Sequence, residues 1–195
     1  MNAQPQEKVI ITSAQYLEFE KNSEIKHEYF DGEIFAMTGA SVKHNRIQHN
    51  INRVLGNTLL NSQCDVFSND MRVKIKQLEK YTYPDILVVC GDIEIENIKG
   101  VETILNPLVI IEILSDSTEA YDRGDKFKHY QFISSLRDYI LVSQHSCWIE
   151  KYKRAGDGQW IYSSCNETGH SITIDSIGCE LLIEDIYYRV MRSID

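Results

Sequence analysis

Two acidic residues of this chain stand inside runs of β-branched and apolar residues. Asp85 follows Tyr83-Pro84 and precedes the apolar segment 86–89, and Glu112 interrupts the apolar run 108–114. Removing a carboxylate from water is costly, so a buried carboxylate usually has a cation or hydrogen-bond donors beside it. Two such strands, each with one acid, predict a divalent metal ion shared by Asp85 and Glu112.

The expected ligands are those that a hard cation prefers. Two carboxylates, completed by the backbone carbonyl of Ile113 and by waters, suit Mg²⁺ or Mn²⁺. Such a metal activates water and neutralises the charge that grows on a phosphate oxygen, which indicates a hydrolase. A second interpretation stays open here, because Asp85 and Glu112 could be a structural pair held by backbone amides or a buried arginine.

Composition narrows the class of protein. The 195 residues are 43% hydrophobic and 25% charged, as in a water-soluble globular protein with a substantial core. The net charge of −9 argues against a protein that coats nucleic acid, but a local basic surface can coexist with it. The five cysteines form no CxxC pair and predict buried free thiols. Without an apolar leader or a membrane-length segment, we expect a cytoplasmic protein with no membrane partner.

The first part of the chain contains the signals of two helices and a hairpin. Thr12 and Ser13 predict the start of a helix that ends near Lys21, after a loose N-terminus over residues 1–10. Residues 27–37 read as a hairpin with Asp31-Gly32 at its turn. Ser41 then predicts the cap of a long helix, whose apolar positions have helical spacing: Ile47, Ile51, Val54, Leu55 and Leu59.

The remaining elements predict an α/β fold. We expect an antiparallel meander of three strands, then a helix that begins at a capping box around Asp116 and Glu119 and ends near residue 132. That helix returns the chain to add another strand to the sheet. The strands expected are 64–75, 83–90, 107–114, 137–143, 148–153, 159–164 and 171–174, with a closing helix over 184–191. Residues 11–195 would form one domain: a mixed sheet core with an N-terminal hairpin and a C-terminal β extension.

The motifs on these elements resemble the PD-(D/E)XK superfamily of restriction-endonuclease-like nucleases. Pro84-Asp85 and Glu112-Ile113-Leu114 carry that resemblance. The chain is more closely similar to one branch, the Uma-two family of restriction endonucleases, which is abundant in cyanobacteria. The segments similar to that family are 27–34 (HEYFDGEI), 68–73 (SNDMRV), 83–85 (YPD), 112–127 (EILSDSTEAYDRGDKF) and 176–181 (SIGCEL).

The resemblance implies a restriction-endonuclease-like fold and a Mg²⁺-dependent or Mn²⁺-dependent endonuclease with DNA as its substrate. The superfamily lysine that positions the attacking water should stand at position 114, where this chain has Leu114. Lys126 is our candidate to replace it, because Asp122, Lys126 and Tyr130 share one helix face. Lys128 is the other lysine nearby, and an Asp122–Lys126 surface ion pair is the structural alternative.

Other polar residues are weaker candidates for the same site. Glu28 or Glu33 could assist catalysis or be solvated strand residues, and His44 could line the cleft or lie on a helix surface without a role. Arg72 could bind a phosphate, or pair with Asp85 or Glu112 and take the place of the metal.

Two functional hypotheses therefore stand. The first is a metal-dependent DNA endonuclease, expected to be a homodimer because cutting both strands needs two sites. The second is a non-catalytic module that binds nucleic acid or protein and retains the nuclease fold, which Leu114 and the net charge of −9 favour.

Overall fold

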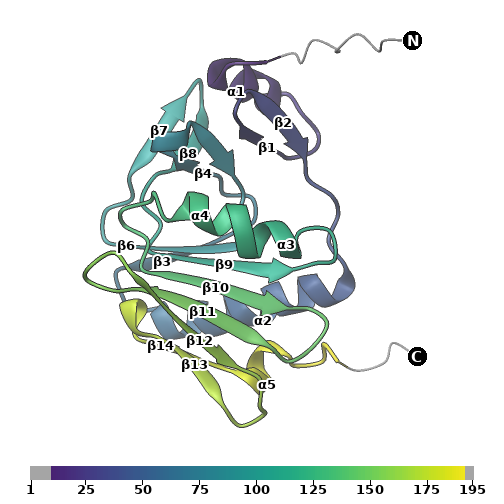
Figure 1. Ribbon diagram of the computed structural model, residues 1–195, viewed down its shortest axis with the longest axis vertical. Coiled ribbons are helices and arrows are strands. Elements are labelled where there is room, and N and C mark those ends of the chain that lie inside the picture. Colours follow the sequence, from purple (N-terminus) through teal and green to yellow (C-terminus); the bar gives the residue numbers. More distant parts are fainter. Residues whose placement is uncertain (1–9, 192–195) are drawn as a thin grey trace.

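A six-stranded mixed sheet lies at the centre of the computed structural model, which describes residues 10–191 (Figure 1). Its strand order is β12-β11-β10-β9-β6-β3, with bounds β3 Cys64–Ser68, β6 Ile86–Cys90, β9 Val109–Leu114, β10 Asp138–Ser143, β11 Ile149–Arg154 and β12 Trp160–Cys165. Strands β3, β6 and β9 are antiparallel, β10 is parallel to β9, and β11 and β12 are antiparallel again. The predicted meander, crossover helix and returning strand are confirmed. The loose N-terminus predicted over residues 1–10 lies, except for Ile10, outside the described residues.

A second six-stranded sheet has the order β2-β1-β5-β4-β8-β7, with bounds β1 His27–Phe30, β2 Glu33–Ala36, β4 Val73–Ile75, β5 Lys80–Thr82, β7 Ile95–Ile98 and β8 Val101–Ile104. The predicted hairpin is β1–β2, and both turn residues have positive φ, 50° at Asp31 and 80° at Gly32. The strand predicted over 64–75 is wrong, because residues 69–72 separate β3 from β4 and the two pair in different sheets. Strands β5, β7 and β8 were not predicted as separate elements.

The helices begin and end close to their expected residues. Helix α1 (Ser13–Lys21) has a capping box between Thr12 and Gln15, and α2 (Val42–Leu59) begins at the Ser41 cap. The expected crossover helix consists of α3 (Glu119–Tyr121), a π-helical turn (Asp122–Lys126) and α4 (Phe127–Tyr130). Its predicted capping box is wrong, since the cap residue is Thr118 and its side chain makes no capping bond. The closing helix is shorter than predicted, α5 (Ile183–Ile186).

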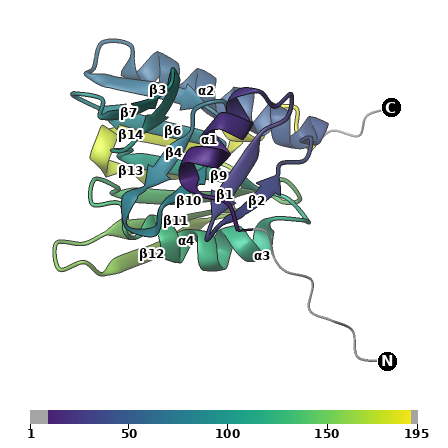
Figure 2. The ribbon, with the colours of Figure 1, turned by 90° about the horizontal axis from the view of Figure 1, so that it is seen from above.

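Helices cover both faces of the central sheet (Figure 2). Helix α2 packs on one face together with α5 and the hairpin β13 (Ser171–Ile174) and β14 (Cys179–Leu182), while α3 and α4 cover the other face. Alternate residues of β9 enter the two cores, so Ile111 and Ile113 face α2 whereas Ile110 and Leu114 face α4. Glu112 has the parity of Ile110 and Leu114 and therefore points towards α3 and α4.

Two of the cysteines form a disulfide, which corrects the prediction of free thiols. The antiparallel register of β3 and β6 places Cys64 opposite Cys90, and the two are bonded. Cys165 and Cys179 are buried free thiols as expected, and Cys147 is free but half-buried. Strand register decides such a pairing, and the spacing of cysteines along the chain does not reveal it. No helix within residues 10–191 combines the length and apolar character that crossing a bilayer requires.

We expect the α2 contact to be essential for stability. Ile51 is fully buried between α2 and the central sheet, so Ile51→Ala should lower the free energy of unfolding by about 2–5 kcal/mol. Asn57 is exposed on the same helix, and Asn57→Ala should change it by no more than about 0.5 kcal/mol. Urea unfolding followed by circular dichroism measures both, and equal effects would contradict the assigned packing.

Candidate active site

The two carboxylates converge at one end of the β6–β9 pair. Asp85 directly precedes β6, and the register Ile86↔Ile111 brings it beside Glu112 and Ile113 of β9. Asp85 Oδ2 accepts a hydrogen bond of 2.7 Å from the Ile113 backbone N–H, and the Asp85 N–H donates to Glu112 Oε2 over 3.4 Å. The side chains are 15% and 3% exposed, so Asp85 is the carboxylate nearer to solvent.

Lys126 enters the same site from the π-helical turn above β9. Its Nζ lies 2.8 Å from Glu112 Oε1, 3.3 Å from Asp122 Oδ1 and 3.6 Å from Glu28 Oε1. π-Helical turns are rare and frequently occur at functional sites, and this one turns both Asp122 and Lys126 inward. The ammonium is thus surrounded by three carboxylates.

The position of Leu114 explains how Lys126 can stand in for the expected lysine. Leu114 lies two residues after Glu112 on the same sheet face, but it is buried in the core below α4. Lys126 reaches Glu112 from the helical segment that covers this face, instead of from the strand. Its side chain is only 8% exposed, so the pair with Asp122 is not the surface ion pair considered from sequence. Lys128 is 71% exposed and pairs with Asp125 outside the site.

Burial sets the protonation of this cluster. Loss of hydration raises the pKa of Glu112 to about 8, although Lys126 opposes the shift. Burial acts to lower the pKa of Lys126, but Glu112 and the neighbouring carboxylates raise it well above its ordinary value. Tyr130 donates a 2.9 Å hydrogen bond to Glu112 Oε1, and burial raises the pKa of this phenol as well. Lys126 and Tyr130 therefore both keep their protons and act as donors.

Glu28 and His44 flank the central cluster. Glu28, on β1, accepts a hydrogen bond from Thr82 Oγ1 in addition to its ion pair with Lys126. His44, in the first turn of α2, lies with Nε2 3.2 Å from Asp85 Oδ2, and its buried Nδ1 has no hydrogen-bond partner among residues 10–191. The structure brings together all five residues selected from sequence as catalytic candidates: Glu28, His44, Asp85, Glu112 and Lys126.

Arg72 does not neutralise either acid. Its guanidinium donates to Thr103 Oγ1 and to the Tyr83 hydroxyl, each over 3.0 Å, and it lies against the rings of Tyr16 and Tyr81. The side chain is buried, so a phosphate-binding role has no support either. The space between Asp85 and Glu112 is therefore not filled by an arginine.

Three supporting residues escaped the sequence analysis. Gln48 of α2 donates a 2.8 Å hydrogen bond to the Asp85 carbonyl, and Thr82 holds Glu28. Lys80 is fully buried, pairs with Tyr121 and with His129 Nδ1, and has a pKa lowered to about 8 by burial. The available signal was the alternation of Lys80 and Thr82 about Tyr81, which places both on the face away from the α1 core.

The side chains fit a hard divalent cation that retains waters. Within residues 10–191 no group of three or more His, Cys, Asp and Glu side chains is arranged to hold a metal. Mg²⁺ commonly binds one or two protein carboxylates and keeps several waters, so Asp85 and Glu112 suffice for it. The N–H and C=O of one strand residue point to the same side, so the Ile113 carbonyl lies on the Asp85 side, like its N–H. Burial raises the pKa of Glu112, so a bound cation would favour the ionised form of this carboxyl group.

Comparison with known proteins bears on the family and the fold of this chain. The family model described as "Uma2: Putative restriction endonuclease" matches residues 13–184. Two uncharacterized proteins of Synechocystis sp. are similar: slr1290 is 35% identical over 91% of each chain, and sll1609 is 36% identical over 78% of this chain and 85% of its own. A crystal structure titled as a "putative nuclease belonging to DUF820" from Anabaena variabilis superposes with a TM-score of 0.75 at 20% identity, over 93% of this chain and 99% of that one. That likeness shows the fold.

The raised pKa of Glu112 predicts how stability varies with pH in metal-free protein. Between its ordinary value of 4.5 and about 8, Glu112 is ionised in the unfolded chain but protonated in the folded one. The unfolded state then binds fewer protons, so stability falls as pH rises through this window. From pH 5 to pH 8, the free energy of unfolding of wild type should fall more than that of Glu112→Gln. Urea unfolding in EDTA measures this difference. Parallel curves for the two proteins would contradict the shift.

Proposed function

This chain belongs to the Uma2 family, and on that premise we propose that it is a metal-dependent endonuclease that hydrolyses phosphodiester bonds in DNA. The observation that carries the proposal is the convergence of Asp85, Glu112 and Lys126, with Lys126 Nζ 2.8 Å from Glu112 Oε1. We place the site in the PD-(D/E)XK class, with its lysine supplied by the helix after the second acid strand.

Asp85, Glu112 and the Ile113 carbonyl would hold Mg²⁺ or Mn²⁺. When bound, the cation supplies an acidified water and positive charge beside the phosphate. With a cation bound, Glu112 would stay ionised, and Lys126 would no longer be the only positive charge beside it.

The chain's own residues orient the reacting groups. Water attacks phosphorus in line and releases a proton to solvent, the new P–O bond forms as the bond to the leaving oxygen breaks, and the leaving oxygen takes up a proton from solvent. Lys126, protonated and fixed by three carboxylates, donates hydrogen bonds that position the water and the phosphate oxygens. Glu28 keeps Lys126 in place, and His44 and Gln48 fix Asp85 through its carboxylate and its carbonyl.

The setting of this activity follows from its substrate. We propose that the protein acts in the cytoplasm, where DNA is accessible, and as a homodimer, which supplies one site for each strand of a duplex. The alternative is a binding module that keeps the fold without cleaving. Leu114 favours it, because the lysine of the superfamily pattern is missing from the strand.

Plasmid nicking in Mg²⁺ or Mn²⁺ tests the proposal. We expect wild type to nick supercoiled DNA, and Asp85→Ala and Glu112→Ala to lose the activity. Lys126→Met should lower the rate by about 10²-fold or more, because a positioned donor is removed. Lys128→Met is the matched control, two residues away but exposed, and should cleave like wild type.

Two results would count against the proposed site. Activity that survives both alanine substitutions would move catalysis elsewhere on the chain. Absence of wild-type cleavage on DNA with either metal, while the protein still binds DNA, would favour the binding module.

A further inference from the structure

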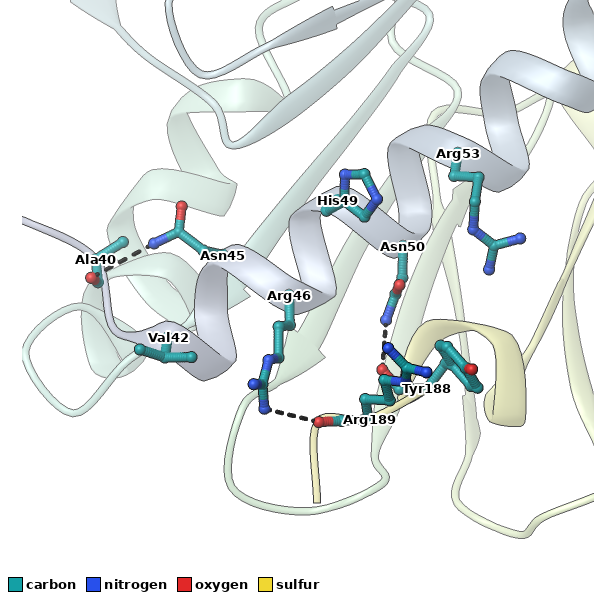
Figure 3. Close-up of a pocket in the computed structure, with 9 residues that line it drawn as sticks. All are labelled: Ala40, Val42, Asn45, Arg46, His49, Asn50, Arg53, Tyr188 and Arg189. Atoms are coloured by element: carbon teal, nitrogen blue, oxygen red, sulfur yellow. Dashed lines mark hydrogen bonds between the residues drawn. The ribbon is translucent and has the colours of Figure 1, made fainter. Parts of the chain in front are cut away.

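A basic hollow lies on the face of α2 that points away from the central sheet (Figure 3). It has a volume of about 570 Å³ and is bounded by the helix and by the segment after α5. Three arginines and a histidine line it, and none of the nine lining residues is acidic: Ala40, Val42, Asn45, Arg46, His49, Asn50, Arg53, Tyr188 and Arg189. In a chain of net charge −9, this is a local concentration of positive charge.

The helix and the later segment each contribute to it. Arg46, His49 and Arg53 are three and four residues apart, so they follow one side of α2, opposite Ile47, Ile51 and Leu55. Arg46 Nη1 donates to the Arg189 carbonyl over 2.9 Å, which ties the two segments together. Asn50 Nδ2 donates to the carbonyls of Ile186 and Tyr188, over 2.9 and 3.0 Å.

Arg189 is held in an uncommon backbone conformation. Its φ is 60°, which a residue other than glycine adopts at a cost, and its guanidinium lies 5.1 Å from the centre of the Tyr188 ring. The hydrogen bonds from α2 to this segment maintain that conformation and bring the Arg189 side chain to the hollow (Figure 3). The gathering of positive side chains at the hollow therefore results from the tertiary packing of α2 against the segment after α5.

We propose that this hollow binds the phosphodiester backbone of a DNA duplex on one side of the cleavage site. The inference rests on the proposed function and names a second contact with the same substrate. Arginine guanidinium groups match phosphate oxygens in a bidentate manner. Arg46 and Arg53 are seven residues apart, about 10 Å along the helix, which equals roughly three base-pair steps of 3.4 Å along a duplex axis.

Helix α2 links this contact to the carboxylates. Its inward side carries His44 and Gln48, which bond the Asp85 side chain and carbonyl, while its outward side carries the arginines. A helix is about 10 Å across, so a strand that passes the start of α2 reaches the outward side within a few nucleotides. Phosphates held by the arginines would thus fix the register of DNA relative to Asp85.

Binding without cleavage tests the hollow separately from catalysis. Fluorescence anisotropy of a labelled 20-base-pair DNA duplex, in EDTA and over a series of salt concentrations, would compare wild type with Arg53→Gln/Arg189→Asn. Asn tolerates the positive φ at position 189. The double variant should bind at least about 10-fold more weakly, and the slope of log K against log salt should decrease by about 2. Arg53→Gln alone should decrease it by about 1, which covers the case of a poorly folded double variant.

The charge-matched control is Arg137→Gln/Lys153→Gln. Arg137 directly precedes β10 and Lys153 of β11 lies opposite Asp138, so both are at the other end of the sheet from Leu114. It should keep the wild-type slope. A smaller salt slope in the hollow variants alone supports DNA binding at the hollow even if no cleavage is found. The DNA-binding proposal and the endonuclease proposal can therefore fail separately. Four results would each overturn the proposal. They are equal salt slopes for the hollow and control variants, no DNA binding by wild type, binding to an RNA duplex but not to DNA, and displacement of the labelled DNA by poly-glutamate as effectively as by unlabelled DNA.

Discussion

The contact of the buried Glu112 carboxyl group with the Lys126 ammonium is the constraint on which the site depends. Glu112 stands in the middle of β9, where both neighbouring strands and two cores exclude water, and burial alone would keep it protonated. Lys126 compensates this cost from the helix above, but it is itself buried and requires Glu28 and Asp122 around it. Removing one partner of such a pair leaves an unpaired buried charge, which costs about 3–5 kcal/mol. Burying this cluster therefore costs stability, and a cost of this kind favours a functional role for the cluster.

Strands β1 and β5 of the second sheet form one wall of that site. Strand β1 delivers Glu28 and β5 delivers Thr82 and Lys80, while their other face packs on α1 through Tyr16, Tyr29 and Tyr81. Helix α2 closes the opposite side with His44 and Gln48. Each wall contributes polar side chains from one face and apolar ones from the other, so the same packing that forms the cores also positions the carboxylates.

Much of the site could be predicted from sequence, and the reasons are physical. The apolar runs around Asp85 and Glu112 specify central strands, and the spacing of Asp122, Lys126 and Tyr130 specifies one helix face. Other features depend on contacts between distant segments. Strands β4 and β5 have three residues each and exist because of their partners, and the Cys64–Cys90 bond follows from register. The approach of Arg189 to Arg46 joins residues 143 positions apart, which no local pattern encodes.

Whether Asp85 and Glu112 share a metal ion is the central question, and calorimetric titration of the full chain with Mn²⁺ tests it most directly. We expect one Mn²⁺ per chain for wild type, loss of binding in Asp85→Asn and in Glu112→Gln, and retained binding in Asp125→Asn, whose carboxylate is exposed beside Lys128. Binding that is unchanged in both site variants, or absent from wild type, would contradict it and leave the buried pair as a structural element of a non-catalytic fold.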